Sequence, residues 1–96
     1  MADIETQGTE PEDAEECFAL GMSYSSGAGV PVDLVQAHKW FNISALRGHP
    51  DGAGLRREIA AQMTDSEIGN AQRAARDWLK THPQTPTEIV AIRNAA

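Results

Sequence analysis

Residues 20–49, LGMSYSSGAGVPVDLVQAHKWFNISALRGH, decide the fold of this chain. Apolar residues on both sides of the glycine-rich centre recur at the three- and four-residue spacing of a helix, without the strict alternation of a strand. The centre, residues 25–32, combines serine, glycine and proline, which is typical of a compact turn. Asp33, followed three residues later by Gln36, is a pattern that begins a helix. The stretch therefore predicts two helices joined by a tight turn, and an all-α fold.

End signals outside this stretch complete the predicted helices. The first helix of the pair is expected to begin at Thr9–Glu12, a capping box with proline in its first turn, and the second to run to Gly48. Beyond the pair we expect three more helices, which makes five in all. They are predicted over residues 51–63, from the Thr64–Glu67 capping box to residue 81, and over residues 86–95.

A short internal repeat links the two halves of the chain. Ala37-x-x-Trp40-Phe41 and Ala75-x-x-Trp78-Leu79 share an Ala-x-x-Trp-apolar pattern at a separation of 38 residues. Each copy lies late in the second helix of a predicted pair. Repeats of this period indicate stacked helical hairpins.

The first hairpin resembles the Sel-one-like repeat family, a subclass of the tetratricopeptide-like helical repeats. The resemblance covers about residues 14–53, and the second copy keeps the Ala-x-x-Trp register but lacks the Gly-x-Gly-Val loop. Ser44 and Gly52 depart from the pattern, which has alanine at both positions, and we expect both departures to loosen the helix packing. The matching residues are Leu20-Gly21-x-x-Tyr24-x-x-Gly27-x-Gly29-Val30-x-x-Asp33-x-x-x-Ala37-x-x-Trp40-Phe41-x-x-x-Ala45-x-x-Gly48-His49.

The resemblance implies a short right-handed solenoid of antiparallel helix hairpins that holds a protein or peptide partner and has no chemistry of its own. The expected organisation is an acidic flexible leader followed by a single helical repeat domain. The leader spans residues 1–11 and the domain residues 12–96, divided into a hairpin at 12–49, a degenerate hairpin at 51–81 and a closing helix at 86–95.

The charge of the chain is concentrated at one end. The formal net charge is −6, and residues 1–16 hold seven of the 14 acidic residues and no basic residue. All eight arginines and lysines lie after residue 16 and are dispersed, without the basic stripe that neutralises a phosphate backbone. We therefore expect no nucleic-acid partner.

Composition and motifs argue against the other classes of function. No apolar run is long enough to cross a membrane, and the acidic N-terminus is unlike a signal peptide, so we expect a cytoplasmic protein without a membrane partner. The three histidines and Cys17 lack metal-ligand spacing, and no nucleophile and base can be paired. We expect no enzyme activity, metal, cofactor or small-molecule substrate.

The leading hypothesis is thus an adaptor or scaffold that presents a helical-repeat groove. The alternative is a self-associating homodimer that covers the open end of the first hairpin or the groove lined by Tyr24 and Trp40. Each proposed partner-binding residue also has a structural interpretation. Tyr24 and Trp40 supply core area, and His38 is expected at the surface or an interface. The arginines belong to solvated faces or, alternatively, line the groove and bind acidic peptide ends. We expect the ring of His49 to cap the preceding helix and Cys17 to be buried. The candidate partner-binding residues are Tyr24, His38, Trp40, Arg56 and Arg73.

Overall fold

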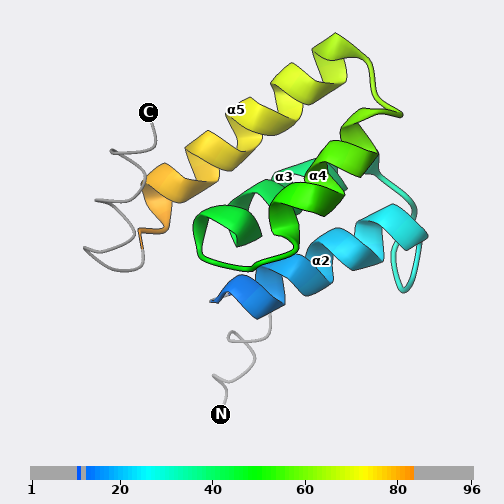
Figure 1. Ribbon diagram of the computed structural model, residues 1–96. Coiled ribbons are helices and arrows are strands. Elements are labelled where there is room, and N and C mark those ends of the chain that lie inside the picture. The colour runs from blue at the N-terminus through cyan, green and yellow to red at the C-terminus, as the bar shows by residue number, and fades with distance from the viewer. Residues whose placement is uncertain (1–10, 12, 84–96) are drawn as a thin grey trace.

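The computed structural model describes residue 11 and residues 13–83, and this part of the chain forms four α-helices and no strand. The predicted all-α class is confirmed, whereas the predicted fifth helix and most of the acidic leader lie outside the described residues. No described helix combines the length and the apolar character needed to cross a membrane. The helices, labelled as in Figure 1, are α2 (Ala14–Ser26), α3 (Leu34–Leu46), α4 (Gly52–Ala60) and α5 (Asp65–Thr81).

Helix α3 lies at the centre, and each of the other three helices packs against it. Figure 1 shows α2 and α5 on opposite sides of α3, with α2 running antiparallel to it and α4 in front. Helix α5 contacts α3 more extensively than it contacts α4. The predicted hairpin of α2 and α3 is therefore a close pair, while α5 packs mainly on the first hairpin.

The helices begin at side chains that accept hydrogen bonds from the first turn. Asp13 and Asp33 accept from the backbone N–H groups of Glu16 and Gln36, at 2.9 and 3.1 Å. Thr64 and Glu67 form the predicted capping box. Helix α2 begins at Ala14, because Asp13 has an extended backbone and its carboxylate accepts from the N–H group of Glu16, while most of the predicted Thr9–Glu12 capping box lies outside the described residues.

Glycines with positive φ end the first two helices. Gly27 and Gly29 have φ values of 82° and 84°, as the predicted turn requires, and Asp33 N–H donates to Tyr24 C=O at 3.0 Å across the loop. At the end of α3, Gly48 has a φ of 104° and its N–H donates to Ala45 C=O, while His49 N–H donates to Ser44 C=O. These two bonds form a Schellman motif, so α3 ends at Leu46 and does not run to Gly48.

Helix α4 is shorter than predicted. It ends at Ala60, and the N–H groups of Gln62 and Met63 donate to carbonyls only three residues back. This tighter turn leads into the extended backbone of Thr64, which caps α5. Helix α4 therefore covers Gly52–Ala60 and not residues 51–63.

Two clusters of apolar side chains share α3 as their centre. The first joins α2, α3 and α5 and contains Cys17, Trp40, Ile43 and Ala75, with Trp78 and Leu79 packed against it. The second joins α2, α3 and α4 and contains Ala37, Phe41 and Ile59, with Phe18 and Leu55 packed against it. Tyr24 contacts both clusters, and the predicted burial of Cys17 is confirmed by its exposed fraction of 0%.

The two departures from the repeat pattern tighten the packing, contrary to the prediction. Ser44 is fully buried, and its hydroxyl donates to Phe41 C=O at 2.8 Å. A Cβ atom on Gly52 would lie 2.5 Å from Ser44 Oγ and 2.8 Å from both Ala45 N and Phe41 O. Because two of these three atoms belong to the α3 backbone, only glycine lets α4 approach α3 so closely.

Candidate functional site

A groove lies between α3 and α5, with a volume of about 410 Å³. Its residues come from the second half of α3 and from one edge of α5. On α5, the buried alanines Ala71 and Ala75 face α3, and the residues that follow them along the helix lie at the margin of that contact. We name this feature the α3–α5 groove and define it by Asn42, Leu46, Gln72, Ala75, Arg76 and Leu79.

The groove combines apolar, amide and cationic groups. Leu46, Ala75 and Leu79 supply aliphatic surface, and Asn42 and Gln72 supply amides that can both donate and accept hydrogen bonds. Arg76 is the cation among the six. This combination suits a peptide, which carries backbone polar groups and apolar side chains together.

The internal repeat brings its two tryptophans into contact between α3 and α5. The rings of Trp40 and Trp78 meet edge to face, with centroids 5.2 Å apart. Arg47 lies over the Trp78 ring at 4.8 Å, and the ring of His82 stacks on it at 4.2 Å. The predicted repeat therefore marks a packing contact between α3 and α5.

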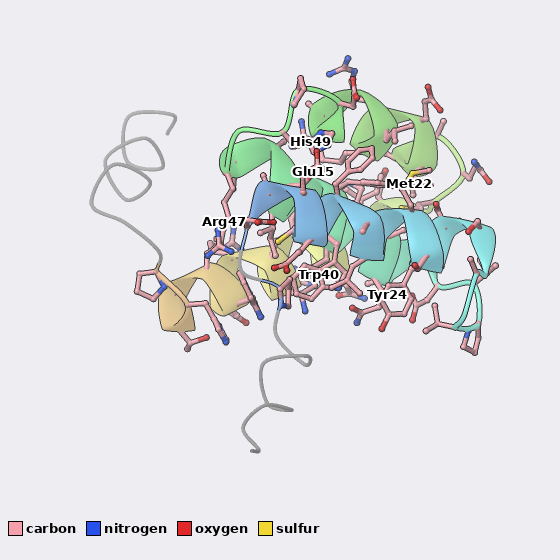
Figure 2. All side chains as sticks on the ribbon, turned by 90° about the horizontal axis from the view of Figure 1, so that it is seen from below. Glu15, Met22, Tyr24, Trp40, Arg47 and His49 are labelled. Atoms are coloured by element: carbon pink, nitrogen blue, oxygen red, sulfur yellow. The ribbon has the colours of Figure 1, made fainter. Side chains whose placement is uncertain are left out.

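Trp40 and Tyr24 lie in or beside the core. Trp40 is 6% exposed, so its side chain is core and does not line an open surface in this structure. Tyr24 is half-buried near the end of α2. Figure 2 shows the two rings together along the edge of α2 that lies opposite Met22 and His49.

His38 is buried, which makes the expectation of a surface residue wrong. It is 2% exposed, and its Nδ1 atom has no hydrogen-bond partner. Burial lowers the pKa of the imidazole from its usual value, and the nearby positive charge of Arg56 lowers this pKa further. The neutral ring is therefore the favoured form. The position is buried because α3 is covered on three sides, whereas a single apolar stripe implies one covered face.

The two candidate arginines occupy different surfaces. Arg56, on α4, donates from Nη1 to Asn42 Oδ1 at 2.5 Å and so reaches the α3–α5 groove. Arg73 donates to Asn70 on its own helix and does not line the groove. Arg56 thus contacts a groove residue, but none of the candidates Tyr24, His38, Trp40, Arg56 and Arg73 is itself among the six residues that line the groove.

The candidate partner-binding residues predicted from the sequence include none of the six residues that line the groove. Gln72, Arg76 and Leu79 follow the four- and three-residue spacing of one helix edge, adjacent to the buried alanines. That spacing was a usable signal for a shared surface on α5. Asn42 and Leu46 show the same four-residue spacing on α3, but which face of α3 stays open depends on how α4 and α5 pack.

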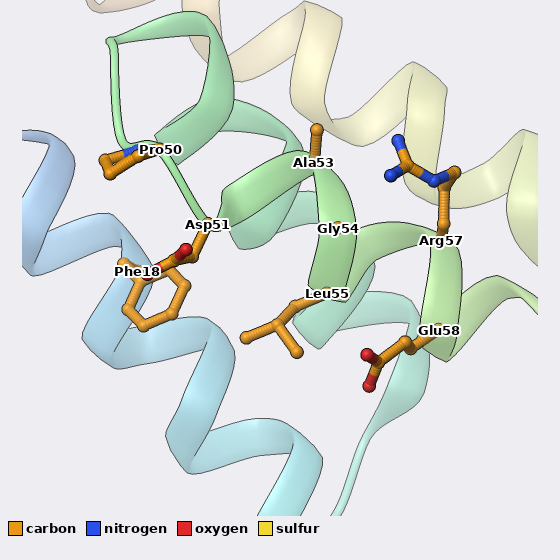
Figure 3. Close-up of a pocket in the computed structure, with 8 residues that line it drawn as sticks. All are labelled: Phe18, Pro50, Asp51, Ala53, Gly54, Leu55, Arg57 and Glu58. Atoms are coloured by element: carbon orange, nitrogen blue, oxygen red, sulfur yellow. The ribbon is translucent and has the colours of Figure 1, made fainter.

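A second cleft lies between α2 and α4, also with a volume of about 410 Å³. In Figure 3 the side chains of Phe18 and Leu55 point toward this cleft from the two helices, while Ala53 and Arg57 extend from the other side of α4. Met22, near this side of α2 in Figure 2, is 45% exposed. We name this cleft between the two helices the α2–α4 cleft. It is lined by Phe18, Pro50, Asp51, Ala53, Gly54, Leu55, Arg57 and Glu58.

His49 joins α2 to the start of α4, and its ring does not cap the preceding helix as predicted. The ring stacks on Phe18, with centroids 3.8 Å apart and planes within 4°. Asp51 N–H donates to His49 Nδ1 at 3.1 Å, and Nε2 lies 3.3 Å from a carboxylate oxygen of Glu15. Because Nδ1 accepts, the neutral ring carries its proton on Nε2, next to Glu15. Figure 2 shows Glu15 and His49 together.

Among the described residues, no group of three or more histidine, cysteine or acidic side chains could hold a metal ion. Burial raises the pKa of the Cys17 thiol, and Arg47 opposes part of this shift by its charge and a hydrogen bond. The thiol is therefore a buried core group within the described part of the chain.

The chain is similar to the alginate biosynthesis protein AlgK of Azotobacter vinelandii, with 31% identity over 83 residues. The match covers 80% of this chain and 17% of that protein, so the chain corresponds to a small part of the relative. No family model matches the chain, and no solved structure matches it. The similarity and the all-helical structure are together consistent with a helical repeat.

Proposed function

We propose that this chain is a non-catalytic unit of the Sel-one-like repeat type that binds a protein or peptide partner in the α3–α5 groove. The single observation that carries the proposal is the groove itself, in which aliphatic, amide and cationic side chains adjoin one another on two packed helices. The hairpin that carries the repeat pattern also has the geometry the pattern requires. Gly27 and Gly29 adopt positive φ, and a Cβ on Gly21 would lie 2.5 Å from the Phe41 ring.

The relative suggests a setting for this binding role. Because the chain resembles part of an alginate biosynthesis protein, we place the partner among the proteins that produce alginate or a related polysaccharide. The chain would then contribute a binding surface and no reaction step. The predicted cytoplasmic location stays a prediction.

The proposal is tested by selecting random peptides displayed on phage against the full chain. A tryptophan at Gln72 (Gln72→Trp) fills the groove from an exposed position, and Arg73→Trp places the same ring one residue along α5, outside the groove. We expect selected peptides that lose binding to Gln72→Trp and keep binding to Arg73→Trp, with both variants folded by circular dichroism. Failure to select peptides, or equal binding to both variants, overturns the proposal. Loss at Arg73→Trp alone transfers the site to the outer face of α5.

Self-association is the second candidate function, and a different surface supports it. Met22 is 45% exposed near Phe18 and Leu55 of the α2–α4 cleft, which leaves apolar area that a second copy of the chain could cover. Light scattering over a wide concentration range measures this directly. A dimer that Met22→Glu converts to a monomer supports this candidate, and a monomer at every concentration contradicts it.

A further inference from the structure

The described lining of the α3–α5 groove carries positive charge only. None of the six described residues that line it is acidic, and Arg76 contributes a guanidinium group. Arg76 makes no hydrogen bond or ion pair with any other described residue. Its five N–H donors are therefore available, within the described part of the chain, to a ligand with oxygen acceptors.

A second cation is fixed beside the groove. Arg56 is partly buried and is held by Asn42, which is itself a groove residue. The hydrogen bond uses Nη1 and leaves other guanidinium donors of Arg56. Two arginines from different helices, α4 and α5, thus adjoin one groove whose remaining lining is neutral.

The apolar part of the groove limits the kind of anion it suits. Leu46, Ala75 and Leu79 adjoin Arg76, so a ligand that fills the groove must present an apolar group near its negative charge. A peptide with a carboxylate close to an aliphatic or aromatic side chain meets both conditions. A nucleic-acid backbone, which needs several spaced cations, does not.

We propose that the occupant of the α3–α5 groove is an acidic peptide segment of a partner protein, in which a carboxylate binds Arg76 and a neighbouring apolar side chain contacts Leu46 and Leu79. This inference rests on the proposed function and specifies its partner. Arg56 is a positioning residue that holds Asn42 and adds positive charge. Paired guanidinium and carboxylate groups form charge-assisted hydrogen bonds, which are stronger than neutral ones.

The test resynthesises the peptides selected on the full chain in two versions, one as selected and one with each Asp and Glu replaced by Asn and Gln. Binding of both is measured by fluorescence anisotropy to the unmodified chain and to Arg76→Gln. The control variant is Arg73→Gln, an exposed arginine on the same helix that does not line the groove. All three proteins are compared at low and high salt.

We expect the acidic version to bind about tenfold more tightly than the amide version and to lose this advantage in Arg76→Gln. Binding to Arg73→Gln should be unchanged, and added salt should weaken only the acidic version. Equal binding of the two versions, or equal losses in the two arginine variants, overturns the inference. Peptides that lose binding to Gln72→Trp but bind Arg76→Gln as tightly as the unmodified chain support the groove function and contradict only the acidic partner. Peptides that bind both Gln72→Trp and Arg76→Gln as tightly as the unmodified chain contradict both proposals.

Discussion

The two sides of α3 are held by different kinds of contact. Toward α4, the contact depends on small residues, because Gly52 lies against the backbone of α3 and Ser44 is fully buried there. Toward α5, the contact combines the buried alanines Ala71 and Ala75 with two large rings, since Trp40 meets Trp78 edge to face. A glycine lets two backbones approach each other directly, whereas a pair of aromatic rings fills the space between two helices. The α3–α5 groove lies beside this mixed contact of alanines and rings.

Trp40→Ala should have the largest effect, because it removes the main ring of the α3–α5 contact. The side chain is 6% exposed, and deleting a buried tryptophan side chain costs about 3–5 kcal/mol of unfolding free energy. Urea unfolding followed by circular dichroism measures this loss. An unchanged stability together with lost peptide binding would move Trp40 from the core to the binding site.

The contact with Trp78 can be separated from the burial of Trp40. Trp78 is half-buried, so Trp78→Ala should cost less than Trp40→Ala. In a double-mutant cycle we expect a coupling of about 0.5–1.5 kcal/mol from the edge-to-face geometry. A coupling near zero would mean that the rings contribute area alone.

Gly52→Ala should have the next largest effect and tests the α3–α4 side. The added methyl group would overlap two backbone atoms of α3, and overpacking of this kind costs about 1–3 kcal/mol. Gly54→Ala is the matched control, because a Cβ at that position of the same helix meets nothing within 4 Å. The control should gain about 0.5–1 kcal/mol from helix propensity. Both variants are measured by urea unfolding. If Gly52→Ala and Gly54→Ala changed the free energy of unfolding in the same direction, close backbone approach would not be what holds α4 to α3.

Local patterns predicted the parts of this fold that depend on neighbouring residues. Asp33, Thr64 and the loop glycines act within a few residues of their own position, and the structure confirms them. The Ala-x-x-Trp repeat identified Trp40 and Trp78, but not that they touch. Such patterns describe each helix separately, and they were sufficient for the all-α class.

The errors arise where several helices meet. His38 lies outside the apolar stripe of its helix, yet it is buried because α3 has neighbours on three sides. Gly52 was expected to weaken packing because a missing methyl group was treated as lost area, whereas the structure uses its absence for close approach. The α3–α5 groove has the same origin, since its residues come from two helices far apart in sequence. The burial of His38, the close approach at Gly52 and the groove therefore cannot be predicted from the pattern of one helix alone.

The pH dependence of stability should show the smallest effect, since it reflects one residue, His38, on the α3–α4 side. Burial and the charge of Arg56 lower the folded-state pKa of His38, so the unfolded chain binds the proton more readily. The free energy of unfolding therefore falls as the pH drops from about 6.5, the usual histidine pKa, toward the lower pKa of the folded state. Above about pH 6.5 the contribution of His38 is constant.

The measurement is urea unfolding at about pH 7.5 and about pH 5.5. His38→Leu removes the titrating group and the Nδ1 atom that has no partner, so the difference between the two pH values should shrink. Because every other residue is common to both proteins, the change between proteins isolates His38. Arg56→Gln should reduce the difference less, because burial is the larger cause and Arg56 the smaller. If His38→Leu kept the full pH dependence, the proton would bind to another group, and burial of the neutral His38 ring would not be the cause of the pH dependence.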